Sequence, residues 1–346
     1  MDLIHPASKA DVVDVVRDAN ASQKRLLVAG GRRHMDKGNP SEVDAELWTT
    51  QLDRLVSYEP AEMIAVVEPG IRVGELRRVL AGGGQEWPSD APHEATVGGV
   101  IASGASSARR LKVGALRDTV LEVEAVTGDG RLVRSGARTV KNVTGYDLHK
   151  AIAGSLGTLA VVVQVALKVR PLPRARRTLA FEGDLALAAT LAAKVPGAAA
   201  VLARPDAVEL RLEGWPEEVE AQASIAERLA RSSAEGDGFP LERPWDAAPV
   251  VAEVAVPPSK LEWAVPGDAW GALAGVGLAW VGLDSTNGDL DGLRERVHAI
   301  GGIAPAIKGP GGLGSPTIPA EKVQRRLKTA FDPNGVLAPG RGWGGL

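Results

Sequence analysis

The sequence of 346 residues contains no cysteine. It therefore holds neither a disulfide bond nor an iron–sulfur cluster ligated by thiolates. It also lacks any run of about 18 uncharged apolar residues, the length that spans a bilayer. The N-terminal segment MDLIHPASKADVV has no basic start followed by an apolar run. We therefore expect a cytoplasmic protein that meets a membrane only peripherally, through a partner.

The sequence also lacks a large excess of either sign of charge. It has 40 Lys and Arg and 43 Asp and Glu, for a formal net charge of −3. Basic residues gather only in segment 170–177, which contains Pro171 and Pro173. We interpret this cluster as a solvated interdomain linker, in preference to a docking patch for an acidic partner. Nucleic acid is not an expected partner. The length and the 45% hydrophobic content suffice for two domains with full cores.

The stretch 140–170 joins a short helical pattern to a strand through glycines. The helical pattern begins at Leu148 and stops at GSLGT, residues 154–158. Residues 159–169 are almost all apolar, which is typical of a strand covered on both faces. Glycines between a helix end and a buried strand let the backbone come close to a bulky ligand.

Two upstream segments indicate a phosphate site. A strand pattern over 25–29 opens into GGRRHMDKG, residues 30–38, whose bare amides can point at phosphate oxygens while Arg32 or Arg33 adds charge. In ATVGGVIASGASS, residues 95–107, a capping Thr96 precedes two glycines and then small residues. A Gly-Gly turn with solvated arginines, or a tight helix–helix crossing, needs similar residues. We expect the two segments to converge on a diphosphate.

Other patterns complete the N-terminal part. Ser8 is the expected N-cap of a helix that runs to about Ala21. The turn Gly128-Asp129-Gly130 joins the strands of a hairpin. The remaining predicted elements of this part are strands at 46–49 and 63–68, a helix at 73–80 and a proline-held loop at 86–92.

In their order, these motifs resemble the FAD-binding domain of the vanillyl-alcohol oxidase and para-cresol methylhydroxylase (PCMH-type) family. The resemblance spans residues 28–170 and the tail 328–341, which includes DPNGVLAPGR. Within the family, the chain is similar to the flavin-bearing subunits of bacterial glycolate oxidase. Members that oxidise 2-hydroxy acids by themselves usually carry Glu where this chain has Leu156, so the resemblance is to an accessory subunit. Relatives often have Asn in place of Ala338.

The resemblance implies FAD as the cofactor and no metal, and it assigns no catalytic residue. Some relatives bind the flavin methyl group covalently through a histidine four residues before the loop glycine, where this chain has His34. A surface histidine that hydrogen-bonds the loop is the alternative. The predicted cofactor-binding residues are Gly30, Gly31, Arg32, Arg33, His34, Pro88, Ser89, Thr96, Val97, Gly98, Gly99, Ala102, Ser103, Gly104, Gly114, Asp118, Tyr146, Gly157 and Thr158.

The expected fold class is α+β: a two-subdomain FAD-binding domain (1–174), a smaller α+β domain of antiparallel strands and helices (175–320), and a C-terminal helix and tail (321–346) that return to the FAD domain. In the second domain we predict strands at 198–203, 208–213, 250–256, 272–282 and 302–308, and helices at 217–231 and 290–299. Its single histidine, His298, is interpreted as part of a solvated helix face.

The resemblance implies the FAD-binding subunit of a glycolate oxidase-like heteromer that oxidises a 2-hydroxy acid, glycolate or lactate, to the 2-oxo acid. Its expected partners are a larger FAD-linked oxidase subunit and an iron–sulfur subunit, since a chain without cysteine cannot carry the cluster or a cysteinyl flavin. Two alternatives stay open. One is a non-catalytic flavin-binding assembly subunit. The other is a solitary FAD-dependent alcohol or sugar oxidase with His34 or Tyr146 as its base.

Overall fold

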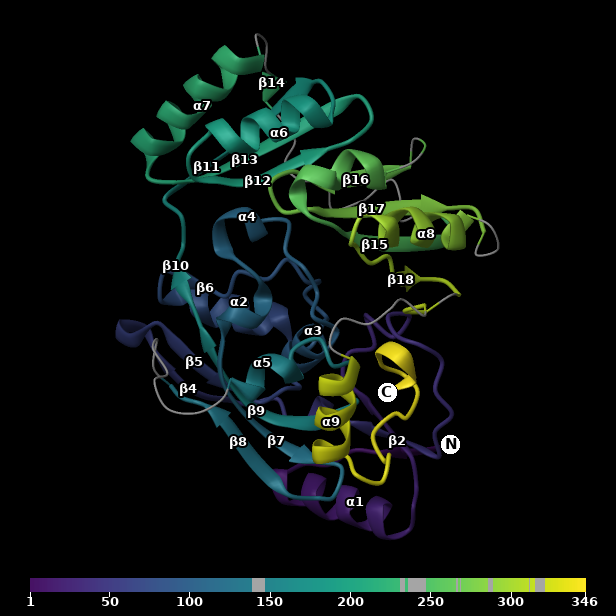
Figure 1. Ribbon diagram of the computed structural model, residues 1–346. Coiled ribbons are helices and arrows are strands. Elements are labelled where there is room, and N and C mark those ends of the chain that lie inside the picture. The colour runs from purple at the N-terminus through teal and green to yellow at the C-terminus, as the bar shows by residue number, and fades with distance from the viewer. Residues whose placement is uncertain are drawn as a thin grey trace. The chain divides into compact units, whose positions relative to one another are not determined.

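The computed structural model describes residues 1–138, 147–230, 234–235, 247–265, 267, 269–285, 289–310, 312–314 and 321–346. The chain divides into two compact units (Figure 1). Unit 1 comprises residues 1–107, 115–172 and 317–346, and unit 2 comprises residues 108–114 and 173–316. The short segment 108–114 therefore belongs with unit 2, although unit 1 surrounds it in the sequence.

The described residues of unit 1 form three sheets. A parallel three-stranded sheet has the order β1 (Asp2–Ile4), β3 (Ala45–Trp48), β2 (Leu26–Ala29). An antiparallel five-stranded sheet has the order β4 (Leu55–Glu59), β5 (Ile64–Val67), β9 (Ala160–Lys168), β7 (Val120–Thr127), β8 (Leu132–Gly136). A two-stranded ribbon pairs β6 (Gln85–Glu86) with β10 (Arg170–Pro171). Residues 160–167 of the central strand β9 are all buried, which confirms the expectation of a strand covered on both faces.

The helices of unit 1 are α1 (Lys9–Ala21), α2 (Val73–Gly82), α3 (Val97–Ser103), α5 (Leu148–Ile152) and α9 (Glu321–Phe331), with 3-10 turns η1 (Thr49–Gln51), η2 (Pro60–Glu62), η3 (Leu116–Thr119) and η7 (Trp343–Gly345). At the start of α1, Ser8 accepts from the Asp11 amide and Asp11 accepts from the Ser8 amide, a capping box that confirms the predicted N-cap. The apolar face of α1 buries Val12 and Val16 completely.

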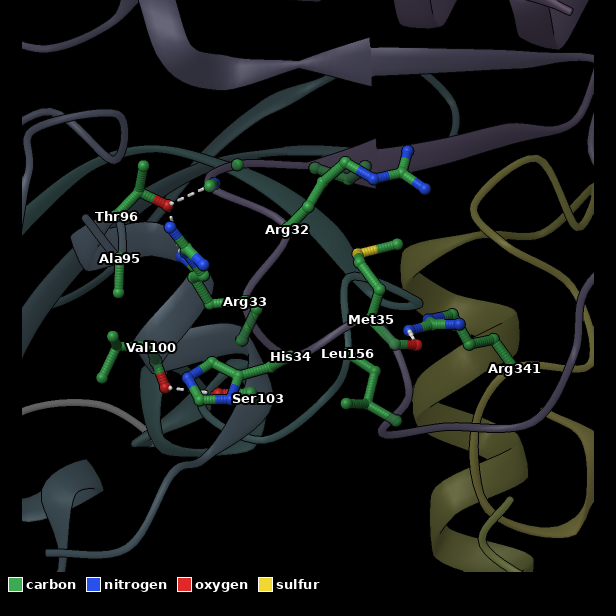
Figure 2. A pocket seen from close by; sticks show the side chains of 15 residues that line it. Arg32, Arg33, His34, Met35, Ala95, Thr96, Val100, Ser103, Leu156 and Arg341 are labelled. Atoms are coloured by element: carbon green, nitrogen blue, oxygen red, sulfur yellow. Dashed lines mark hydrogen bonds between the residues drawn. The ribbon is translucent and has the colours of Figure 1, made fainter. Parts of the chain in front are cut away.

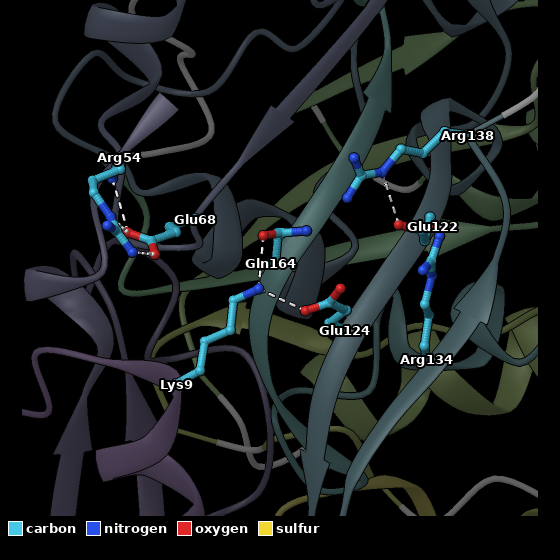
Figure 3. Close-up of polar contacts among 8 residues, drawn as sticks. All are labelled: Lys9, Arg54, Glu68, Glu122, Glu124, Arg134, Arg138 and Gln164. Atoms are coloured by element: carbon cyan, nitrogen blue, oxygen red, sulfur yellow. Dashed lines mark hydrogen bonds and ion pairs between the residues drawn. The ribbon is translucent and has the colours of Figure 1, made fainter. Parts of the chain in front are cut away.

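Charged side chains on and beside the five-stranded sheet are paired (Figure 3). Lys9 of α1 donates to Glu124 (2.6 Å) and to Gln164 (2.7 Å), which fastens the helix to strands β7 and β9. Glu68 and Glu122 are buried, and arginines at the sheet margin neutralise both. Removing one partner of such a pair leaves an uncompensated charge, so these contacts fix the sheet and the helix in one arrangement.

The C-terminal tail returns to unit 1, as predicted, and lies beside β2 (Figure 1). The Leu26 amide donates to Val336 O (2.7 Å), and the Ala338 amide donates to Leu26 O (2.8 Å). Asp332, which is 2% exposed, accepts from two tail amides and from Lys328. The tail thus extends the parallel sheet next to the strand that leads into the glycine loop.

Unit 2 is built on an eight-stranded antiparallel sheet with the order β14 (Ala234–Glu235), β11 (Ala175–Glu182), β13 (Ala207–Gly214), β12 (Ala198–Ala203), β16 (Trp270–Leu273), β17 (Leu278–Leu283), β15 (Val250–Ala255), β18 (Ala306–Lys308). Its helices are α4 (Arg110–Val113), α6 (Leu185–Lys194), α7 (Pro216–Ala230), the 3-10 helix η5 (Pro258–Ala264) and α8 (Asp291–Ala299). Side chains of α6, α7, η5 and α8 share one core with the strands. The predicted α+β class is confirmed.

Two details of unit 2 differ from the sequence-based expectation. The single strand predicted at 272–282 is a hairpin, β16 and β17, because Gly275 and Gly277 take φ values of 78° and 76° that reverse the chain. Strand β11 and helix α6 were not predicted. His298 of α8 is exposed, in agreement with its interpretation as part of a solvated helix face.

Candidate FAD site

The two glycine-bearing segments of unit 1 meet at one hydroxyl group (Figure 2). Strand β2 ends at Ala29 and opens into the glycine loop, defined here as residues 30–39. Thr96 caps α3, and its Oγ1 accepts from the Gly99 amide (3.3 Å) and from the Gly31 amide of the glycine loop (3.2 Å). Thr96 is 1% exposed. Local capping therefore also joins the two segments, and their convergence on a diphosphate remains a prediction.

The glycines are required by the closeness of this contact. A Cβ atom at Gly30 would lie 2.2 Å from Thr96 Oγ1, and one at Gly98 would lie 2.6 Å from Pro69 Cβ. Both separations are far below van der Waals contact. The glycine loop can approach Thr96 only without a side chain at Gly30, and the start of α3 can pack on Pro69 only without one at Gly98.

A cavity opens between the glycine loop, the start of α3 and the segment after α5. Nine predicted cofactor-binding residues line it: Gly30, Gly31, Arg32, Arg33, His34, Thr96, Gly99, Ala102 and Ser103. Six lining residues were not predicted: Val28, Met35, Ala95, Val100, Leu156 and Arg341. The amides of Arg32 and Arg33 donate to no acceptor within the part of the chain that the structure describes. Free amides beside a positive side chain suit a diphosphate, so the residues present fit FAD.

The segment after α5 is tied to α3. The Gly154 amide donates to Ile101 O (2.9 Å), and the Leu156 amide donates to Ala102 O (2.8 Å). Leu156 lines the cavity with φ of 57°, a left-handed conformation that is costly for a leucine. The predicted site residue Gly157 follows with φ of 77° and packs on the cavity residue Val28.

Arg341 of the tail holds the far end of the glycine loop. Its Nη2 donates to Met35 O and to Lys37 O, each at 2.8 Å, while the Asn39 amide donates to Arg341 O (2.9 Å). The side chain is buried, and burial, followed by the nearby charge of Arg32, lowers the pKa of Arg341. Sequence reasoning did not assign Arg341 to the site. The only signal was its place after Pro-Gly in the family-like tail.

The other predicted site residues lie outside the lining of this cavity. Ser89 is buried in a loop whose carbonyls accept from Arg77, and Gly98 donates its amide to Pro69 O (2.8 Å). Asp118 is exposed. Tyr146 lies outside the described residues, and Gly114 belongs to unit 2. Cofactor contact remains a prediction for these and for the rest of this group: Pro88, Val97, Gly104, Gly157 and Thr158.

His34 lies at the cavity wall, and in Figure 2 its ring is directed toward Ser103. A histidyl flavin at this position remains a prediction. Across the described residues, no group of three or more histidine, aspartate or glutamate side chains is arranged to hold a metal ion. Nor does any described helix combine the length and the apolar character that crossing a bilayer demands.

Comparison with known proteins agrees with this geometry. Residues 3–136 match the family described as FAD binding domain. Glycolate oxidase subunit GlcE of Escherichia coli (strain K12) is 28% identical, over 95% of this chain and 96% of that protein. D-lactate dehydrogenase of Archaeoglobus fulgidus is 32% identical, over 52% of this chain and 41% of that protein. The solved structure of alkyldihydroxyacetonephosphate synthase shares the fold, with a TM-score of 0.70 and 18% identity over 97% of this chain and 76% of that one.

The chain thus spans nearly all of GlcE but less than half of the D-lactate dehydrogenase. The match of residues 3–136 to an FAD binding domain confirms the predicted cofactor, and the solved structure confirms the predicted fold of unit 1.

Proposed function

We propose that this FAD-dependent oxidoreductase is the FAD-binding subunit of a heteromeric complex that oxidises a 2-hydroxy acid, glycolate or lactate, to the 2-oxo acid. The observation that carries the proposal is the similarity to a glycolate oxidase subunit over almost the whole of both chains. We further propose that the complex works in the cytoplasm, against a membrane only through a partner.

When bound, FAD supplies the chemistry by accepting two electrons from the substrate as a hydride. The residues of this chain position it. Thr96 joins the glycine loop to α3, the amides of Arg32 and Arg33 are available to phosphate oxygens, and Arg341 fixes the loop from the tail. The buried carboxylates Glu68 and Glu122 on and beside the five-stranded sheet are neutralised by arginines, so they are structural groups.

Onward electron transfer is assigned to a partner. The sequence has no cysteine, so a chain that carries electrons onward through an iron–sulfur cluster must be a different one. Leu156 at the cavity wall provides no proton-transfer group. His298, the single histidine between residues 173 and 316, is exposed on α8. These features favour a relay role beside a larger FAD-linked subunit that binds the 2-hydroxy acid.

The test is an absorbance spectrum of the purified chain, alone and co-purified with its genomic neighbours, before and after anaerobic addition of glycolate or D-lactate. A yellow chain that bleaches only in the complex supports the proposal. Bleaching of the isolated chain identifies a self-sufficient oxidase. A yellow chain that stays oxidised in both samples identifies a non-catalytic assembly subunit. A colourless chain that takes up no added FAD refutes the proposal.

The non-catalytic assembly subunit is the second candidate, and the same two features favour it: Leu156 in the cavity wall and the exposed His298. A solitary oxidase requires a base at the flavin, and His34 lines the cavity. Acid precipitation separates covalent from non-covalent cofactor. Colour in the pellet that disappears in His34→Ala identifies a histidyl flavin, whereas a yellow supernatant excludes one.

A further inference from the structure

We propose that the Arg33 side chain neutralises the diphosphate of FAD and sets the affinity for diphosphate-bearing ligands, whereas the side chain of its neighbour Arg32 is a positioning group that does not touch the ligand. The inference rests on the proposed FAD function and deepens it by assigning different roles to two adjacent arginines. The sequence alone does not distinguish between them.

Arg32 is directed away from the ligand space by its backbone and held by its partners. Its φ of 53° is left-handed. Its guanidinium pairs with Glu46, donating to Oε1 at 2.6 Å, and lies over the Trp48 ring at 5.6 Å from the centroid. The side chain of Glu46 is 3% exposed and also accepts from Trp48 Nε1 (2.8 Å). A buried carboxylate needs this cation, so Arg32 is committed to the wall of the parallel sheet.

Arg33 is directed the opposite way. In Figure 2 its side chain extends toward the start of α3, beside Thr96 and Ala95, whereas Arg32 points away from them. Arg33 lines the cavity, and its guanidinium has no hydrogen-bond or ion-pair partner anywhere in the described ranges. Its exposed side chain thus places an uncommitted positive charge next to the free amides of the glycine loop.

The other arginines near the loop are already occupied. Arg72 approaches Gly31 but donates to the carbonyl of Glu94 and does not line the cavity. Arg341 donates to carbonyl groups of the glycine loop. Among the four arginines described at this site, only Arg33 is available to an anion. A guanidinium pairs with phosphate oxygens through two parallel N–H donors, which a flavin without phosphate does not offer.

The experiment measures Kd for FAD, ADP and riboflavin by fluorescence quenching and calorimetry on the full-length wild type, Arg33→Ala, Arg33→Lys, Arg33→Glu and Arg32→Ala. We expect Arg33→Ala to weaken FAD and ADP by about 10- to 100-fold, the worth of a charge-assisted contact, and to leave riboflavin unchanged. Arg33→Lys should recover part of the loss, and Arg33→Glu should exceed it. The salt dependence of Kd should become shallower in Arg33→Ala, because one ionic contact is gone.

Arg32→Ala is the matched comparison. It should lower the melting temperature of the protein, because the buried carboxylate of Glu46 loses its cationic partner. Arg33→Ala should leave the melting temperature unchanged. An FAD Kd for Arg33→Ala within twofold of wild type at low salt overturns the proposal, and so does an equal loss for riboflavin. If wild type binds no FAD, the proposed function itself fails; normal FAD binding and reduction in the Arg33 variants refutes only the assignment of Arg33.

Discussion

The contact between Arg341 and the glycine loop predicts that cofactor retention depends on a residue from the far end of the sequence. In Arg341→Ala, Met35 O and Lys37 O each lose a charge-assisted donor at 2.8 Å inside a mostly buried site. Hydrogen bonds to a charged group contribute about 1.5–3 kcal/mol each, and the two share one side chain. We therefore expect the closed loop to lose about 2–4 kcal/mol relative to open conformations.

That loss sets an upper limit of about 30- to 700-fold on the rise in the FAD Kd, since every 1.4 kcal/mol is a factor of ten. The affinity falls because only the fraction of molecules with a closed loop binds the cofactor. Hydrogen exchange reports the opening directly. The Asn39 amide, which donates to Arg341 O, should lose protection in the variant, whereas amides in β9 should not.

Two matched variants make the reasoning refutable. Arg341→Lys keeps the charge but lacks the forked donor, so its FAD Kd should fall between those of wild type and Arg341→Ala. Arg325→Ala removes an exposed arginine of α9 whose ion pair with Glu321 spans one helical turn, and it should leave FAD binding unchanged. Wild-type exchange at Asn39 together with wild-type FAD affinity in Arg341→Ala would show that the tail does not hold the loop.

Gly30→Ala should abolish FAD binding, because its Cβ would lie 2.2 Å from Thr96 Oγ1, while Gly82→Ala, at a helix end with open space, should bind FAD normally; a flavin titration of both variants decides. His149 predicts a pH effect: burial lowers its pKa, so the unfolded chain binds the proton more tightly and stability falls as the pH drops below the ordinary histidine value of about 6.5. Urea unfolding at pH 7.5 and pH 5.5 should show a smaller loss in His149→Gln than in wild type, and an equal loss would contradict this assignment.

Local signals carried most of the fold prediction. Strand β12 has the predicted bounds, and helix α9 lies in the predicted C-terminal segment, because apolar patterns and flanking residues determine them locally. The sequence predicted one strand in place of the hairpin of β16 and β17, because the turn between them, residues 274–277, contains only apolar residues and glycine. Segment 108–114 belongs to unit 2 because of tertiary contacts, such as the hydrogen bond that Lys112 donates to Glu213 O. Hydrophobic periodicity along the sequence does not reveal contacts of this kind.

In the candidate site, too, features set by neighbouring residues were predictable, whereas contacts between distant parts of the sequence were not. Thr96 and the glycines were predictable, since a cap and a bare turn are local chemistry. Arg341 was missed because its partners lie about 300 residues earlier in the sequence. The opposite directions of Arg32 and Arg33 depend on one dihedral angle and on Glu46, a partner fourteen residues away. No pattern of neighbouring residues encodes that choice.

The backbone of Arg32 allows the cost of that choice to be measured. Of the five non-glycine residues described with positive φ, Arg32 and Leu156 line the cavity. This placement indicates that backbone strain is kept at positions that set the direction of side chains around the cavity. Arg32→Ala and Arg32→Gly lose the same contacts with Glu46, but only glycine accepts a φ of 53° without strain. Relief of about 1–2 kcal/mol, less about 0.4–1 kcal/mol for the more flexible unfolded chain, leaves Arg32→Gly the more stable by about 0.8 kcal/mol at the middle of both ranges. Urea unfolding of the two variants measures this difference, and equal or reversed stability would mean that the left-handed turn is not maintained against strain, so that Arg32 is held by Glu46 alone.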